Sequence, residues 1–268
     1  MAEGYWVIRT YKAGSVGEKS KFWVDARRMP RSEKKLKMDA RKAAANDSSA
    51  LKTVARLLNA NFRKGDYLIG LDYSNEGYRK LTNGIEGYEK MEEAEQAEAV
   101  RQAAEHELRL CLRRVNYALG KGEEEMKYIG ITSDMDGDTG EAVRIHHHAV
   151  INREAFEAFR SKWKLGGFAF RKLKGQKDYT PIAKYLLDQV RRIPDAKKYI
   201  PSRNLVRPQP KDRIARNGSM LRPPKGAVVV QFDEWRPGKP QYMRYILPEA
   251  ADRGGTRSGR KNKQRKKE

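Results

Sequence analysis

Apolar residues recur with two different periods along this chain, and each period predicts one kind of element. Runs in which apolar residues alternate with polar ones, or follow one another almost without interruption, are typical of β-strands. Such runs occupy 67–73, 127–134, 142–151, 168–170 and 227–232. Apolar residues spaced three and four apart are typical of helices. They occur in segments that begin near Asp47 or Ser48 and near Thr180, and along 88–119 and 154–163.

The order of these segments predicts the fold class. In the centre of the chain a strand is followed by a long helix, a hairpin, a helix, a strand and a helix. The first strand is closed by the polar turn Ser74–Gly77. Mixed units of this kind form an α+β fold, with a central antiparallel sheet flanked by helices. Composition divides the chain into a basic N-terminal arm (1–49), a central domain (50–206), a basic C-terminal extension (207–250) and a tail (251–268) that we expect to be disordered.

The charge of the chain points to a polyanionic partner. The 268 residues contain 57 Lys and Arg against 35 Asp and Glu, which gives a formal net charge of +22. Binding of phosphates by so many cations releases condensed counterions. There is one cysteine, Cys111, which excludes a disulfide framework. No apolar run approaches the ~18 residues of a membrane span. With no signal-peptide pattern at the start, we expect a cytoplasmic protein without a membrane partner.

Histidine is scarce, and three of the four histidines are consecutive, from His146 to His148. In a strand, His146 and His148 point to one face and His147 to the other, with the paired imidazoles about 7 Å apart. Two such imidazoles can share a metal ion if further ligands are present. Asp134, at the end of the preceding strand, is the first acidic candidate, and Glu141 is the second. The alternative is a polar strand edge without a metal.

A tyrosine lies in the helix that begins near Thr180 and Pro181. Tyr185 falls in the second turn of this helix, directly after Lys184. A tyrosyl oxygen can attack a phosphodiester and form a covalent phosphotyrosine. Lys184 or a bound metal ion would offset the charge of the transition state. The alternative is that Tyr185 is an ordinary half-buried packing residue.

Taken together, these segments resemble the rolling-circle replication initiators of the HUH endonuclease superfamily, in particular plasmid and phage proteins related to the filamentous-phage replication protein. The resemblance covers about 50–206 and rests on three motifs in order: Leu71-Asp72-Tyr73 ending a strand, His146 and His148 on a second strand, and Tyr185 on a helix. It implies an endonuclease domain with a five-stranded antiparallel sheet and both histidines on a central strand. His146, His148 and a third ligand would hold Mg²⁺ or Mn²⁺, and Tyr185 would form a 5′-phosphotyrosine. The partners would be single-stranded or origin DNA, a host polymerase and a helicase.

The sequence also departs from this family's pattern. Where the family commonly has a Glu near position 133, this chain has Ser133 and Asp134, so the third ligand is Asp134, Ser133 or Glu141. Many members have a Lys three residues after the nucleophile, and here that residue is Asp188. Pro181 occupies the place of a second tyrosine, which favours a single-tyrosine enzyme.

Two alternative functions remain open. One is a relaxase or transposase of the same superfamily, and the other is a non-catalytic DNA- or RNA-binding protein with a decayed motif. In each case we expect phosphates to be contacted by a set of basic side chains that comprises Arg144, Arg203, Lys261 and Lys263.

Overall fold

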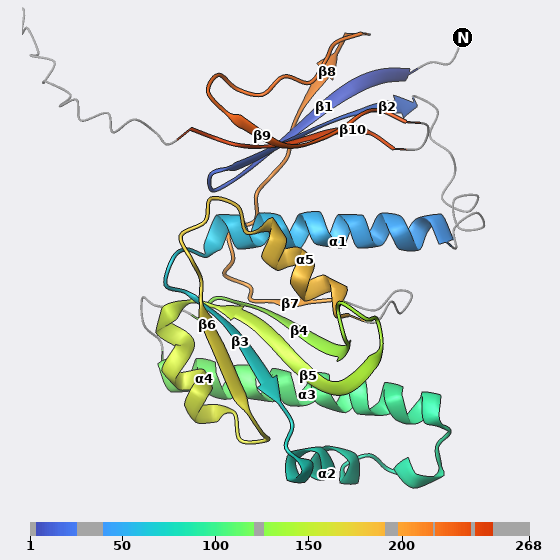
Figure 1. Ribbon diagram of the computed structural model, residues 1–268, viewed down its shortest axis with the longest axis vertical. Helices are drawn as coiled ribbons and strands as arrows, with labels where there is room; N and C mark the ends of the chain where they lie inside the picture. The colour runs from blue at the N-terminus through green and yellow to red at the C-terminus, as the bar shows by residue number, and fades with distance from the viewer. Residues whose placement is uncertain are drawn as a thin grey trace, which may run out of the picture.

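The computed structural model describes residues 4–25, 40–120, 126–190, 198–216, 218–236 and 239–248, with the side chains of 40–45 left out. Its described part consists of two five-stranded antiparallel sheets with helices between and around them (Figure 1). This confirms the predicted α+β class. No helix among these residues is both long enough and apolar enough to cross a membrane.

The first sheet contains the strands that the sequence predicts in the central domain. Its strand order is β6-β3-β5-β4-β7, so β5 lies in the middle. Every neighbouring pair is antiparallel. The bounds are β3 (Tyr67–Asp72), β4 (Tyr128–Met135), β5 (Ala142–Ile151), β6 (Phe168–Lys172) and β7 (Ile200–Pro201). β5 carries the three histidines, and its central position agrees with the expected arrangement.

Helices cover both faces of the first sheet. One face packs on α3 (Glu93–Leu119) and α4 (Phe156–Lys162), and the other packs on α1 (Ala40–Asn61) and α5 (Thr180–Asp188) (Figure 1). The alternation of side chains along β5 divides the core accordingly, because Ala149 belongs to the α3 side and Val150 to the α1 side.

The turn expected after β3 is instead the beginning of a helix. α2 spans Asn75–Asn83, and the Ser74 hydroxyl accepts a hydrogen bond from the Gly77 N–H at 3.0 Å. A serine in this position is a preferred N-cap, because it satisfies one of the helix's free N–H groups. Short 3₁₀ turns at Tyr88–Lys90 and Arg153–Ala155 precede α3 and α4.

The sequence predicts one strand of the second sheet, at 227–232, but not the sheet itself. It has the order β8-β1-β2-β10-β9 and joins the two ends of the chain. The bounds are β1 (Gly4–Ala13), β2 (Val16–Asp25), β8 (Lys211–Ala215), β9 (Val228–Asp233) and β10 (Gln241–Ile246). Residues 4–25, which the sequence assigns to the N-terminal arm, form β1 and β2 of this sheet, and β2 pairs with β10 over 200 residues later in the chain. The tail 251–268 lies outside the described residues.

The second sheet sits on α1 and on the segment before α5. The β1–β2 turn lies so close to α1 that a Cβ at Gly14 would come within 2.3 Å of the Asn59 carbonyl oxygen. The Ser15 hydroxyl donates to the Lys177 carbonyl at 2.6 Å. The Arg244 guanidinium lies 3.6 Å from the Asp178 carboxylate. These contacts fix the second sheet against the helical layer that carries Tyr185.

Candidate active site

The strand register assigns each histidine to one face of the first sheet. His146 stands opposite Asp72 on β3 and Ser133 on β4, and His148 stands opposite Gly70 and Ile131. Directly paired residues point to the same side of a sheet. Ile131 belongs to the cluster packed on α1 and α5, so His146 and His148 also face these helices.

His147 points the other way and is completely buried. Its Nε2 is hydrogen-bonded with the Tyr73 hydroxyl at 2.9 Å and its Nδ1 with the Thr132 hydroxyl at 3.0 Å. Burial, followed by the neighbouring His146 and His148, lowers the pKa of His147 to about 3. His147 is therefore a neutral core residue that links β5 to β4 and to the residue that follows β3. The imidazoles of His146 and His148 lie on the opposite face of the sheet.

The structure brings together the three residues on which the functional prediction depends. The rings of His146 and His148 are 4.9 Å apart, and the ring of Tyr185 lies 5.7 Å from that of His148. α5 contributes Tyr185, which is anchored because Ala183 and Leu186 are buried beside it. Tyr185 remains 48% exposed.

Gln189 completes this group and was missed in the sequence. It follows α5 immediately, four residues after Tyr185, a spacing that places two side chains on one face of a helix. Its amide nitrogen donates to the Tyr185 carbonyl at 2.9 Å, and its Oε1 lies 2.9 Å from His148 Nε2. The hydroxyl of Ser133, which is fully buried, donates to the Gln189 carbonyl at 2.6 Å. The Ser133 side chain thus holds the main chain of Gln189 in place.

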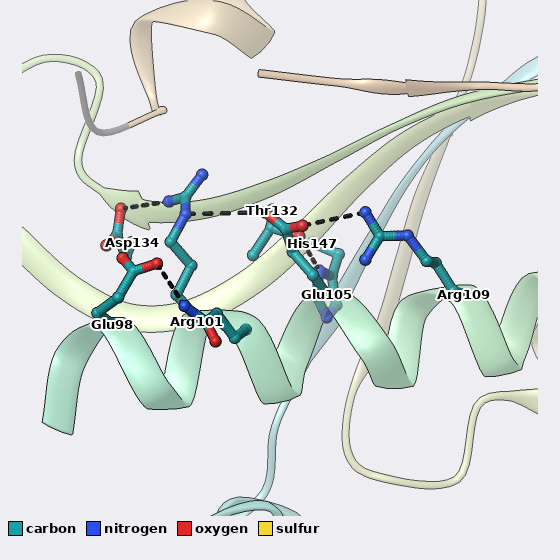
Figure 2. A network of polar contacts seen from close by, with 8 residues as sticks. Glu98, Arg101, Glu105, Arg109, Thr132, Asp134 and His147 are labelled. Atoms are coloured by element: carbon teal, nitrogen blue, oxygen red, sulfur yellow. Dashed lines mark hydrogen bonds and ion pairs between the residues drawn. The ribbon is translucent and has the colours of Figure 1, made fainter. Parts of the chain in front are cut away.

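Asp134 does not join the histidines. It lies on the α3 side of the sheet, where its carboxylate is 3.4 Å from the Arg101 guanidinium. Figure 2 shows Arg101 reaching from α3 to Asp134, with Glu105 and then Arg109 following along the helix. Arg101 and Asp134 are 4% and 7% exposed, so both charges are buried. The prediction of Asp134 as a metal ligand is therefore corrected: its side chain belongs to a structural ion pair.

The second acidic candidate is also displaced from the site. Glu141 is exposed at the end of the β4–β5 hairpin. The hairpin itself is tied by Asp136, whose carboxylate accepts the N–H groups of Asp138 and Thr139 at 2.9 and 2.8 Å. Asp72, directly opposite His146, is instead the acidic residue on the face of the paired histidines.

The predicted basic residues are dispersed. The Lys184 ammonium pairs with Asp188 one turn further along α5. Arg144 donates to the Asn75 side chain on α2 at 2.8 Å and lies over the Tyr78 ring. Arg203 lies near Tyr128, at the opposite end of β4 from Ser133. Lys261 and Lys263 are outside the described residues.

The side-chain nitrogen and oxygen atoms around His146 and His148 provide some of the ligands that a divalent metal ion needs. Nδ1 of His146 is hydrogen-bonded to the Arg144 carbonyl at 2.9 Å, which leaves Nε2 for a metal, as is usual for ligating histidines. Burial, and then His146, lowers the pKa of His148, which favours the neutral form that ligates. No group of three or more His, Cys, Asp or Glu side chains among the described residues is arranged to hold a metal. The third donor that the geometry offers is the amide oxygen of Gln189.

Comparisons with known protein families, with curated proteins and with solved structures found no match to this chain.

Proposed function

We propose that this protein is a metal-dependent, site-specific DNA nicking and joining enzyme that starts rolling-circle replication of a plasmid, phage or integrated element. The observation that carries the proposal is the meeting of Tyr185 with His146 and His148 on one face of the sheet, although 37 positions separate Tyr185 from His148 in the chain. A half-exposed tyrosine beside two imidazoles that can hold a metal ion suits covalent phosphodiester cleavage with the phenol oxygen as nucleophile.

In this proposal Tyr185 is the nucleophile. Its oxygen attacks the scissile phosphorus, the bond from phosphorus to the 3′ oxygen breaks, and a 5′-phosphotyrosine and a free 3′-hydroxyl result. Attack by a 3′-hydroxyl on the phosphotyrosine reverses the step and joins two ends. His146, His148 and the Gln189 amide oxygen would hold Mg²⁺ or Mn²⁺, which supplies Lewis-acid polarisation of the phosphate. Gln189 also binds the Tyr185 carbonyl, so it orients the nucleophile's helix against the histidines.

The expected partners follow from this reaction. Single-stranded origin DNA is the substrate, and a host polymerase and helicase would use the free 3′-hydroxyl and the displaced strand. A cytoplasmic location suits such a reaction and agrees with a buried, unpaired Cys111.

A second candidate is a non-catalytic DNA- or RNA-binding protein. One observation favours it: Lys184, the residue expected to offset charge on the phosphate, is paired with Asp188 in the described structure. The high positive charge of the chain suits either function.

The test is detection of the covalent adduct. Labelled single-stranded DNA fragments that tile both strands around the coding sequence are incubated with the protein and Mn²⁺, then separated on a denaturing gel with and without proteinase. We expect a slowly migrating band that requires Mn²⁺, disappears with proteinase and is absent for Tyr185→Phe. Tyr117→Phe is the matched control, because Tyr117 is 90% exposed on α3. If no fragment forms an adduct while salt-sensitive binding persists, the non-catalytic candidate replaces the enzyme.

A further inference from the structure

A large cleft lies between the second sheet and α1, away from the histidines. Its walls are formed by β1, β2 and β10, by the β9–β10 connection and by residues 48–56 of α1, and its volume is about 1530 Å³. Figure 1 shows the sheet lying over α1. Pockets for small ligands measure about 300–1,000 Å³, so this cleft has room for a segment of a polymer.

Basic side chains outnumber acidic ones in the lining of the cleft. Three acidic residues line it, against Arg9, Lys52, Arg56, Arg236 and Lys239, whereas the ammonium of Lys19 donates to the Arg222 carbonyl at 2.7 Å on the other face of the sheet. Some of this charge is compensated, because Arg56 pairs with Glu18 at 2.6 Å and Arg9 with Asp212 at 2.7 Å.

Other cations in the cleft remain available for phosphates. The Lys52 ammonium lies 4.0 Å from the centre of the Tyr242 ring, and no carboxylate among the described residues forms an ion pair with it. Burial in the cleft lowers the pKa of Lys52, so a phosphate beside it would stabilise its charged form. Arg236 and Lys239 are exposed at the mouth of the cleft.

Aromatic rings alternate with these cations. Tyr11 and Phe22 line the cleft from neighbouring strands, and the register of β1 and β2 places both on the face toward α1, since they lie on the same side as Glu18 and Arg9. The Arg56 guanidinium covers the Tyr11 ring at 3.5 Å, and that of Arg9 lies 5.2 Å from the Phe22 ring. Flat rings interleaved with cations are how proteins bind single strands, because bases stack on the rings while phosphates meet the cations.

We propose that this cleft binds single-stranded nucleic acid, with phosphates at Lys52, Arg236 and Lys239 and with a base against Phe22. A duplex is disfavoured because its bases are already stacked on one another and cannot reach rings inside a cleft. The site is distinct from the histidine site, and binding to it does not require Tyr185. It would hold a strand on the same body that carries the nucleophile, since β1 and β2 are fixed to α1.

The test measures binding without cleavage. Full-length protein carrying Tyr185→Phe is titrated into labelled 20-nucleotide oligo(dT), oligo(U) and a 20-base-pair duplex, and fluorescence anisotropy is followed over a range of salt concentrations. A double variant of the cleft, Lys52→Gln with Lys239→Gln, tests whether the positive charges of these two side chains bind phosphates. The matched control is Lys12→Gln with Arg213→Gln, which removes the same charge from exposed positions of the same sheet that do not line the cleft. Phe22→Leu tests stacking while it keeps an apolar side chain of similar size.

We expect tighter binding of the single strands than of the duplex, and preference for oligo(dT) or oligo(U) identifies the natural ligand as DNA or RNA. The double cleft variant should lower affinity at least fivefold and reduce the slope of log K against log salt by about 0.7 for each phosphate that the protein no longer neutralises. Phe22→Leu should lower affinity about fivefold. The proposal is overturned if the control pair loses as much affinity as the cleft pair, if the cleft variants bind like the parent, or if the duplex binds best. Formation of the covalent DNA adduct is measured separately on the protein with Tyr185 intact. A loss of the proposed nicking activity can therefore be distinguished from a loss of binding in the cleft.

Discussion

Substitution of Asp134 separates two roles for this carboxylate, a metal ligand and a structural ion-pair partner. In the structure Asp134 is 7% exposed and lies 3.4 Å from Arg101, whose guanidinium is equally buried. Among the described residues, Asp134→Ala would leave Arg101 with one carboxylate partner, Glu105, at 3.8 Å. The variant should therefore lose stability and keep its capacity to bind metal at the opposite face of the sheet.

The size of the loss follows from burial. Removal of one partner from a buried ion pair costs about 3–5 kcal/mol, because the remaining charge has neither water nor a counterion. Glu105 retains part of the interaction, so we expect the lower end, ~3 kcal/mol. For a chain of this length that loss lowers the melting temperature by roughly 6–12 °C. Replacement of both partners, Arg101→Met with Asp134→Leu, should recover much of it, since no buried charge remains.

The assay combines urea unfolding, followed by circular dichroism, with calorimetric titration of Mn²⁺ into the folded protein. Asp138→Ala is the matched control: Asp138 lies in the same hairpin but is exposed. Its stability and Mn²⁺ affinity should match those of the parent. If Asp134→Ala unfolded like the parent but no longer bound Mn²⁺, Asp134 would be a metal ligand and not a structural ion-pair partner.

Four further predictions concern individual side chains. Gln189→Ala should weaken Mn²⁺ binding about tenfold in calorimetry, and an unchanged affinity would remove Gln189 from the donor set. Lys184→Gln should change the rate of adduct formation less than threefold because its ammonium pairs with Asp188; complete loss would show that Lys184 acts on the phosphate. Cys111, whose pKa burial raises to about 11, should resist alkylation by iodoacetamide at pH 8 in the folded protein and react fully in urea; rapid labelling without urea would contradict its place in the α3 core. His147 has a pKa of about 3 when folded against an ordinary value of 6.5, so the unfolded chain binds the extra proton between these values. The contribution of neutral His147 to the free energy of unfolding is therefore fully present above pH 6.5. It falls as the pH decreases, by at most ~1.4 kcal/mol per pH unit. His147→Gln should reduce this pH dependence in unfolding experiments with chelator present.

The central sheet could be predicted from local pattern. The segments 67–73 and 142–151 correspond to β3 and β5, the latter with the bounds that the sequence predicts. β3 is mostly apolar and buried, and β5 is buried on both faces from Ala149 to Ile151, where its apolar residues follow one another.

The second sheet could not be predicted in the same way. β9 corresponds to the predicted strand at 227–232, but β1 and β2 mix charged with apolar residues because only part of each face is covered. Their pairing with strands more than 190 residues away depends on the fold of everything between them. A local pattern contains no information about such a distant partner.

The sequence by itself determined the candidate chemistry: two imidazoles on one face of a strand and a tyrosine in the second turn of a short helix. The periods of strand and helix are local geometry, so these assignments needed no tertiary information. Only the tertiary structure decided which groups join them. It paired Ser133 with His146, so that the next residue, Asp134, points to the opposite face and meets Arg101, and it brought Gln189 beside His148. It also created the cationic cleft, whose walls come from opposite ends of the chain and meet only when the second sheet closes over α1.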